Sequence, residues 1–133
     1  MIGDGGQGPR APEHPWRESF GYAWQGVAHV WRTQRNIRFE ALAAGMALLL
    51  AVLLDAPLTP ILLVSVLVLT LEVLNTAIEA LVDLVTPTFH PLAKIAKDAA
   101  AGAVLVGAIG SLVIGFVTLA LPLWRWLQRL GGL

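Results

Sequence analysis

Three stretches of this chain are long and strongly apolar, and each is long enough to cross a membrane as a helix. They cover residues 36–54, 58–85 and 94–124, and within the third stretch residues 99–124 carry no charge. About 20 residues in helical conformation match the thickness of the hydrocarbon core of a bilayer. The pattern therefore predicts an all-α integral membrane protein with three transmembrane helices.

A further helix is predicted before these spans, over residues 16–33. Its apolar residues Phe20, Trp24, Val27 and Trp31 follow one another at steps of four, three and four, which places them on one face. Tryptophan rings and the arginines that flank them are favoured at the lipid headgroup boundary. We expect an amphipathic helix in the membrane interface; the alternative is a helix packed on soluble protein.

The remaining N-terminal residues, 1–15, are polar and rich in glycine and proline. A segment of this composition buries too little apolar surface to offset the entropy lost on ordering. We expect a disordered tail, followed by a single membrane-embedded domain over residues 16–129. Glycines in the tail match G-x-G-x-x-G, but no strand precedes them, so they predict no dinucleotide site.

Composition and charge exclude several classes of function. The chain has 133 residues, of which 56% are hydrophobic and 14% charged, and 9 basic and 9 acidic side chains give a formal net charge of zero. Without a broad basic surface, no nucleic-acid partner is expected. The chain has no cysteine, which excludes disulfides, thiolate metal sites and a cysteine nucleophile.

The distribution of lysine and arginine predicts the orientation in the cell membrane. Basic residues precede the first span and lie between the second and third, so these two regions are expected on the cytoplasmic side. Arg125 and Arg129 follow the last span and depart from this rule.

Polar residues interrupt the second span along one face. Asn75, Thr76, Glu79 and Asp83 follow Glu72 at offsets of three, four, seven and eleven residues, so all five lie near one helical stripe. A carboxylate at the centre of a bilayer costs about 2.5–3.5 kcal/mol on insertion scales. Such residues are functional candidates; the alternative is a network that only holds helices together.

The third span opens with Lys94, Lys97 and Asp98, spaced to share one face at the same membrane side as the stripe. Asp98 taken alone could instead cap the start of a helix. Together with the stripe, these residues supply what phosphoryl transfer requires: acids for a divalent cation, ammonium groups for phosphate oxygens and a carboxylate as base. The chain has no G-x-x-x-x-G-K-[ST] motif, so no P-loop holds the phosphates.

Small residues recur every four positions further along the third span. They are Ala99, Ala103, Gly107, Ser111 and Gly115. A stripe of this kind lets helices approach closely, and we infer that it serves an oligomer.

Two motifs in this region resemble the small prokaryotic diacylglycerol kinase family, which includes the undecaprenol kinases. They are E-V-L-N-T-A-I-E at residues 72–79 and H-P-L-A-K-I-A-K-D-A-A-A-G-A-V at residues 90–104, and the likeness extends from about Phe20 to Gly115. The resemblance implies a homotrimer that phosphorylates a lipid hydroxyl with ATP and Mg²⁺, at active sites shared between subunits and open to the cytoplasm.

The resemblance also implies roles for the matched residues. Glu72 would be the general base toward the lipid hydroxyl, Asn75 would orient or bind the substrate nearby, and Glu79 would hold magnesium. Lys97 and Asp98 would match the pair that contacts the nucleotide.

Three further residues complete the expected site. Lys94 and Arg17 are candidates for substrate or nucleotide binding. Near the start of the first span, where the family often has a second acidic metal ligand, this chain has Gln34. Gln34 offers a carbonyl oxygen without charge, so weaker magnesium binding or help from another group is expected.

The sequence leaves the lipid acceptor open. The sequence of residues 90–98 resembles the undecaprenol kinase branch more closely. Both acceptors stay candidates: diacylglycerol, which would give phosphatidic acid, and undecaprenol, which would give undecaprenyl phosphate. A small cation- or proton-coupled transporter, or a structural membrane subunit, would also place charges in a helix bundle. A transporter needs a route across the membrane, whereas these charges gather toward one side.

Overall fold

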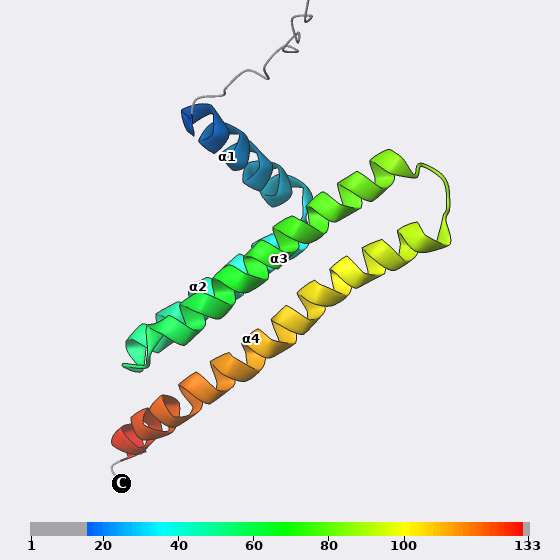
Figure 1. The fold of residues 1–133 in the computed structure, drawn as a ribbon. Coiled ribbons are helices and arrows are strands. Elements are labelled where there is room, and N and C mark those ends of the chain that lie inside the picture. Colours follow the sequence, from blue (N-terminus) through cyan, green and yellow to red (C-terminus); the bar gives the residue numbers. More distant parts are fainter. Residues whose placement is uncertain (1–15, 132–133) are drawn as a thin grey trace, which may run out of the picture.

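The computed structural model describes residues 16–131, which form four α-helices. They are α1 (Trp16–Thr33), α2 (Arg35–Leu53), α3 (Leu58–Val85) and α4 (Pro91–Gly131). Figure 1 shows α2, α3 and α4 side by side along their lengths, whereas α1 leaves this bundle at an angle. The predicted disordered tail, residues 1–15, lies outside the described residues.

Helices α2, α3 and α4 are each long and apolar enough to cross a membrane. Their leucine, valine and isoleucine side chains are largely exposed on the surface of the chain, as hydrocarbon-facing side chains are. Helix α1 exposes its aromatic side chains, including Phe20 and Trp24. The predicted fold class is confirmed: an all-α integral membrane protein with three spans, preceded by an amphipathic helix.

A tight turn joins α2 to α3. Asp55 has φ 54°, in the left-handed region that aspartate tolerates better than most residues, and Pro57 is the N-cap of α3. The Ala56 amide donates to the Ala51 carbonyl at 2.8 Å, which satisfies a carbonyl at the end of α2. The turn sets α2 and α3 antiparallel and closes a small apolar core around Ala51, Ala56 and Ile61.

Proline residues bound the loop between α3 and α4. Helix α3 ends at Val85, next to the pair Thr86-Pro87, because proline disfavours helical conformation in the residue before it. Helix α4 begins at Pro91, where the missing N–H of proline leaves no intrahelical hydrogen bond unmade.

The side chain of His90 caps α4. Its Nδ1 accepts a hydrogen bond from the Leu92 amide at 3.2 Å. Asp98 lies about two helical turns further along α4, where it forms an ion pair with Lys94. The alternative reading of Asp98 as a helix cap is therefore wrong.

Helices α3 and α4 pack closely through small side chains. Gly107 faces Leu71 and Val68 of α3. The Ser111 hydroxyl donates to the Gly107 carbonyl at 2.8 Å and lies 3.5 Å from the Val64 carbonyl of α3. The inference that the small-residue stripe serves an oligomer is wrong for these two positions, which pack within the chain.

Replacing Gly107 with isoleucine should destabilise the contact between α3 and α4. A Cβ at this position would lie 2.7 Å from Leu71 Cδ1, and overpacking of a helix contact typically costs about 1–3 kcal/mol. Gly107→Ile should lower the unfolding temperature in detergent. Gly110→Ile is the matched control, because a Cβ there meets nothing within 4 Å; equal effects of the two variants would contradict this account.

Candidate functional site

The polar stripe of α3 runs from the interior of the bundle to the loop between α3 and α4. The Glu72 residue is 2% exposed and Thr76 is also buried, Asn75 and Glu79 are half-buried, and Asp83 is exposed. The Thr76 hydroxyl donates to the Glu72 carbonyl at 3.0 Å, so it is used within its own helix. The stripe thus presents a buried carboxylate at one end and a solvated one at the other.

A second carboxylate, Glu40 on α2, lies opposite Glu72. The two acids are close enough to repel each other electrostatically, Glu79 adds to this repulsion, and the Asn36 side chain hydrogen-bonds to Glu72. The Oε2 atom of Glu40 is buried and has no hydrogen-bond partner among the described residues. Because a buried, unpaired polar atom is costly, Glu40 is a candidate for binding a substrate hydroxyl.

Neither Glu40 nor Asn36 is among the residues selected from the sequence. A signal was present, since Glu40 is the single carboxylate in the predicted span 36–54. The sequence does not show that Glu40 lies opposite Glu72, because this depends on the register that the α2–α3 turn sets between the two helices.

Asn75 positions the carboxylate of Glu79. Its Nδ2 donates to Glu79 Oε1 at 3.2 Å, and its own Oδ1 is buried without a partner among the described residues. The free amide oxygen and the second carboxylate oxygen of Glu79 are both hard oxygen donors, the kind of ligand that Mg²⁺ prefers.

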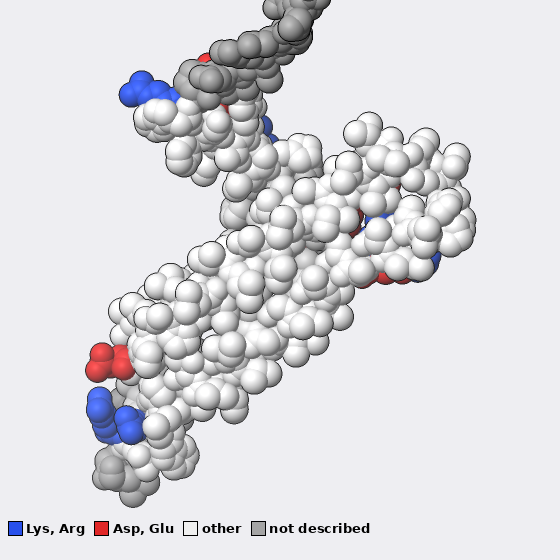
Figure 2. All heavy atoms as spheres, viewed as in Figure 1, with Lys and Arg blue, Asp and Glu red and all other residues white. Residues whose placement is uncertain are grey.

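Two exposed ion pairs lie at the exposed end of the stripe, beside the α3–α4 loop. Lys97 Nζ donates to the two carboxylate oxygens of Asp83 at 2.9 and 3.1 Å, and Lys94 pairs with Asp98. All four residues line a hollow of about 480 Å³, and Figure 2 shows acidic and basic atoms together at this end of the bundle. Exposed pairs contribute at most about 1 kcal/mol, so these lysines can exchange carboxylates for a ligand at little cost.

Arg17 lies apart from this cluster within one chain, and Gln34 lies at the start of α2. The Arg17 guanidinium packs over the ring of Trp16, 5.5 Å from its centroid, in the first turn of α1, which points away from the bundle (Figure 1). Gln34 is the N-cap of α2 and makes no capping hydrogen bond with its side chain. The roles predicted for both residues stay predictions.

The described residues bring together no group of three histidine, cysteine, aspartate or glutamate side chains that could hold a metal ion by themselves. Magnesium does not require such a group, because it commonly uses one or two carboxylates together with water and substrate phosphates. Glu79, held by Asn75 and with a second oxygen available, fits that mode of binding.

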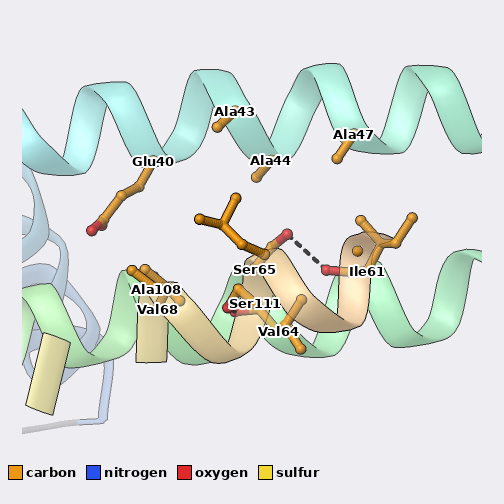
Figure 3. Close-up of a pocket in the computed structure, with 12 residues that line it drawn as sticks. Glu40, Ala43, Ala44, Ala47, Ile61, Val64, Ser65, Val68, Ala108 and Ser111 are labelled. Carbon is orange, nitrogen blue, oxygen red and sulfur yellow. Dashed lines mark hydrogen bonds between the residues drawn. The ribbon is translucent and has the colours of Figure 1, made fainter. Parts of the chain in front are cut away.

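An apolar groove begins at Glu40 and runs between α2, α3 and α4. Its volume is about 230 Å³. Figure 3 shows Glu40 at one end of the groove and Ala47 and Ile61 toward the other. The rest of its lining is mostly small or aliphatic: Ala43, Ala44, Val64, Ser65, Val68, Ala108, Ser111, Leu112 and Gly115. An apolar path inside the membrane spans therefore ends at the Glu40 carboxylate, next to buried Glu72.

Fold and site together define an integral membrane protein whose buried acids and exposed lysines gather at one end of a three-helix bundle. The family model for prokaryotic diacylglycerol kinase matches residues 21–119. The chain belongs to this family, which is one of membrane lipid kinases.

Curated relatives carry two names. A diacylglycerol kinase of Synechocystis is 48% identical over 109 residues, which cover 79% of this chain and 62% of that protein. An undecaprenol kinase of Bacillus subtilis is 45% identical over 103 residues, covering 75% of this chain and 84% of that protein. A diacylglycerol kinase of Escherichia coli is 36% identical over 107 residues, covering 78% and 84%.

Proposed function

We propose that this chain is a lipid kinase that transfers the γ-phosphate of ATP, bound with Mg²⁺, to the hydroxyl of diacylglycerol or undecaprenol. The products are phosphatidic acid or undecaprenyl phosphate, together with ADP. The observation that carries the proposal is the pairing of buried Glu72 with half-buried Glu40, which lies at the end of an apolar groove. A lipid alcohol needs this combination: an apolar path for its chain and a base at its hydroxyl.

Glu72 is the general base in this proposal. As the lipid oxygen attacks the γ-phosphorus, its proton passes to the Glu72 carboxylate, the bond from the γ-phosphorus to the bridging oxygen breaks, and ADP leaves. The unpaired Oε2 of Glu40 accepts a hydrogen bond from the hydroxyl before transfer and holds it next to Glu72. Asn36, which hydrogen-bonds to Glu72, fixes the direction of that carboxylate.

The nucleotide occupies the hollow beside the α3–α4 loop. Lys97 and Lys94 exchange Asp83 and Asp98 for phosphate oxygens, since the existing pairs are exposed and weak. Asp98, on the same face of α4, contacts the nucleotide with Lys97. Glu79 would hold Mg²⁺ through a carboxylate oxygen, and the bound ion would neutralise phosphate charge.

The site is completed by a second copy of the chain. Within one chain Arg17, in the first turn of α1, lies away from the bundle, so we propose a homotrimer in which a neighbouring α1 brings Arg17 to the shared site. The excess of lysine and arginine before α2 and between α3 and α4 supports a cytoplasmic position for this end of the bundle.

The groove argues against a transporter. The hydroxyl groups of Ser65 and Ser111 in its lining donate to carbonyls of their own helices, at 2.7 and 2.8 Å. The other lining residues beyond Glu40 are apolar. Such a groove suits a hydrocarbon chain better than a moving ion.

Purified protein should transfer labelled phosphate from ATP to at least one of the two lipids, and Glu72→Gln should lose that activity. Loss of a general base typically costs about 10²–10⁴-fold. The variant should remain folded and keep its oligomeric state by size-exclusion chromatography in detergent. Wild-type protein that phosphorylates neither lipid would refute the proposal; an active Glu72→Gln variant would remove Glu72 from the base role.

Gln34→Glu should make magnesium bind more tightly, because it places a charged oxygen where the chain has a neutral one. The magnesium concentration that gives half-maximal activity should fall several-fold, with little change in thermal stability. Gln25→Glu, on α1, is a matched control for added charge. An unchanged half-maximal concentration in Gln34→Glu would exclude position 34 from the metal site.

Ala44→Leu should obstruct the groove. Forcing extra methyl groups into a packed site costs about 1–3 kcal/mol, so phosphorylation of a long-chain acceptor should fall roughly tenfold, while a short-chain alcohol should be less affected. Gly45→Leu adds the same side chain at the next position, where a Cβ meets nothing within 4 Å. Equal losses in both variants would show that the groove does not hold the acceptor chain.

A further inference from the structure

A second charged hollow lies at the opposite end of the bundle, between the α2–α3 turn and the last turns of α4. Its volume is about 130 Å³. Figure 2 shows acidic and basic atoms next to each other at this end. The lining residues are Leu53, Leu54, Asp55, Pro122, Arg125, Trp126 and Arg129.

The charged side chains around this hollow are not paired with each other. Among residues 16–131, no ion pair within 4.0 Å involves Asp55, Arg125 or Arg129, whereas Lys94 pairs with Asp98 and Lys97 with Asp83 at the other end of the bundle. Two guanidinium groups and one carboxylate thus border the same small volume with their hydrogen-bonding capacity available. The turn holds Asp55 in this place with a left-handed backbone.

The hollow lies at the level expected for lipid headgroups. Residues 99–124 of α4 carry no charge, and Arg125 follows this uncharged run directly. Trp124 and Trp126 flank Arg125, and tryptophan is enriched where hydrocarbon gives way to headgroups. Apolar side chains of α4 below this level, including Leu121, are exposed for contact with acyl chains.

We propose that this hollow binds the phosphoethanolamine headgroup of a membrane phospholipid, at a site separate from the kinase site. Arg125 and Arg129 donate to the phosphate oxygens, a pairing that guanidinium groups make with good geometry. The primary ammonium of the headgroup donates to the Asp55 carboxylate. Phosphatidylcholine should bind less well, because its trimethylammonium group has no N–H to donate to Asp55. Phosphatidylglycerol should also bind less well, because its headgroup has no cation and leaves Asp55 beside a phosphate of like charge. The proposal also gives a reason for two arginines on the side of the membrane where the lysine and arginine distribution predicts few.

Native mass spectrometry of the full chain, incubated in detergent with lipids of identical acyl chains, tests the proposal. Wild-type protein should retain phosphatidylethanolamine more strongly than phosphatidylcholine or phosphatidylglycerol. Arg125→Gln with Arg129→Gln should reduce phosphatidylethanolamine retention roughly tenfold, or about 1.4 kcal/mol. Asp55→Asn should remove the preference over phosphatidylglycerol while binding of the phosphate persists. Arg32→Gln with Arg35→Gln, which removes two cations at the other end of the bundle, should leave the preference unchanged.

Three results would overturn the proposal. The first is equal retention of the three lipids by wild-type protein. The second is an unchanged preference in the double arginine variant. The third is a lower unfolding temperature of Asp55→Asn in lipid-free detergent without any change in lipid preference, because this would assign the three charges to an internal ion pair. Should the double variant fail to fold, Arg125→Lys with Arg129→Lys keeps the charge, loses the planar donor geometry and is expected to weaken retention.

Discussion

The cost of placing a carboxylate in hydrocarbon is the constraint on which this structure depends. Glu72 and Glu40 lie close together on adjacent spans; Glu72 is 2% exposed, and Glu40 is half-buried with its Oε2 atom shielded from solvent. A fold meets that cost only if the two acids are given partners or a proton. Asn36 supplies one partner to Glu72, whereas one oxygen of Glu40 has none among the described residues. Such an arrangement is expected where binding and chemistry, rather than stability, determine the residues.

Helix lengths decide which polar groups meet water. Helix α2 has 19 residues and α3 has 28, so at 1.5 Å per residue α3 is longer by about 14 Å. Because the α2–α3 turn aligns the two helices at its own end, the surplus of α3 extends past the start of α2. Asp83 lies in that extension and pairs with Lys97 of α4. Glu72 and Asp83 therefore belong to one stripe, but Glu72 lies inside the bundle and Asp83 is exposed.

Much of the fold and part of the site could be predicted from the sequence, because both depend on periodicity. Three apolar runs define the spans, and the spacing from Glu72 to Asp83 defines a stripe whatever surrounds it. Contacts between helices could not be predicted in this way. In the sequence, Glu40 is a single acid near the start of a span, and only the fold shows that it lies opposite Glu72.

Two local interpretations failed for the same reason. Asp98 resembles a capping residue only if α4 starts near it, but His90 and Pro91 start the helix two turns earlier. Gly107 and Ser111 resemble a surface for a second copy, but α3 of the same chain already covers them.

The weakness of the ion pair between Asp83 and Lys97 bears on how such an enzyme would reset. A lysine that leaves its carboxylate at little cost also returns to it at little cost. The carboxylates of Asp83 and Asp98 therefore compete with a bound phosphate for Lys97 and Lys94. In the proposed mechanism, Asp83 and Asp98 would pair with their lysines again after phosphate transfer, and the spent nucleotide would be released into water. Buried lysines would bind the nucleotide more tightly but would slow its release, whereas exposed and weakly paired lysines at the membrane surface favour rapid turnover.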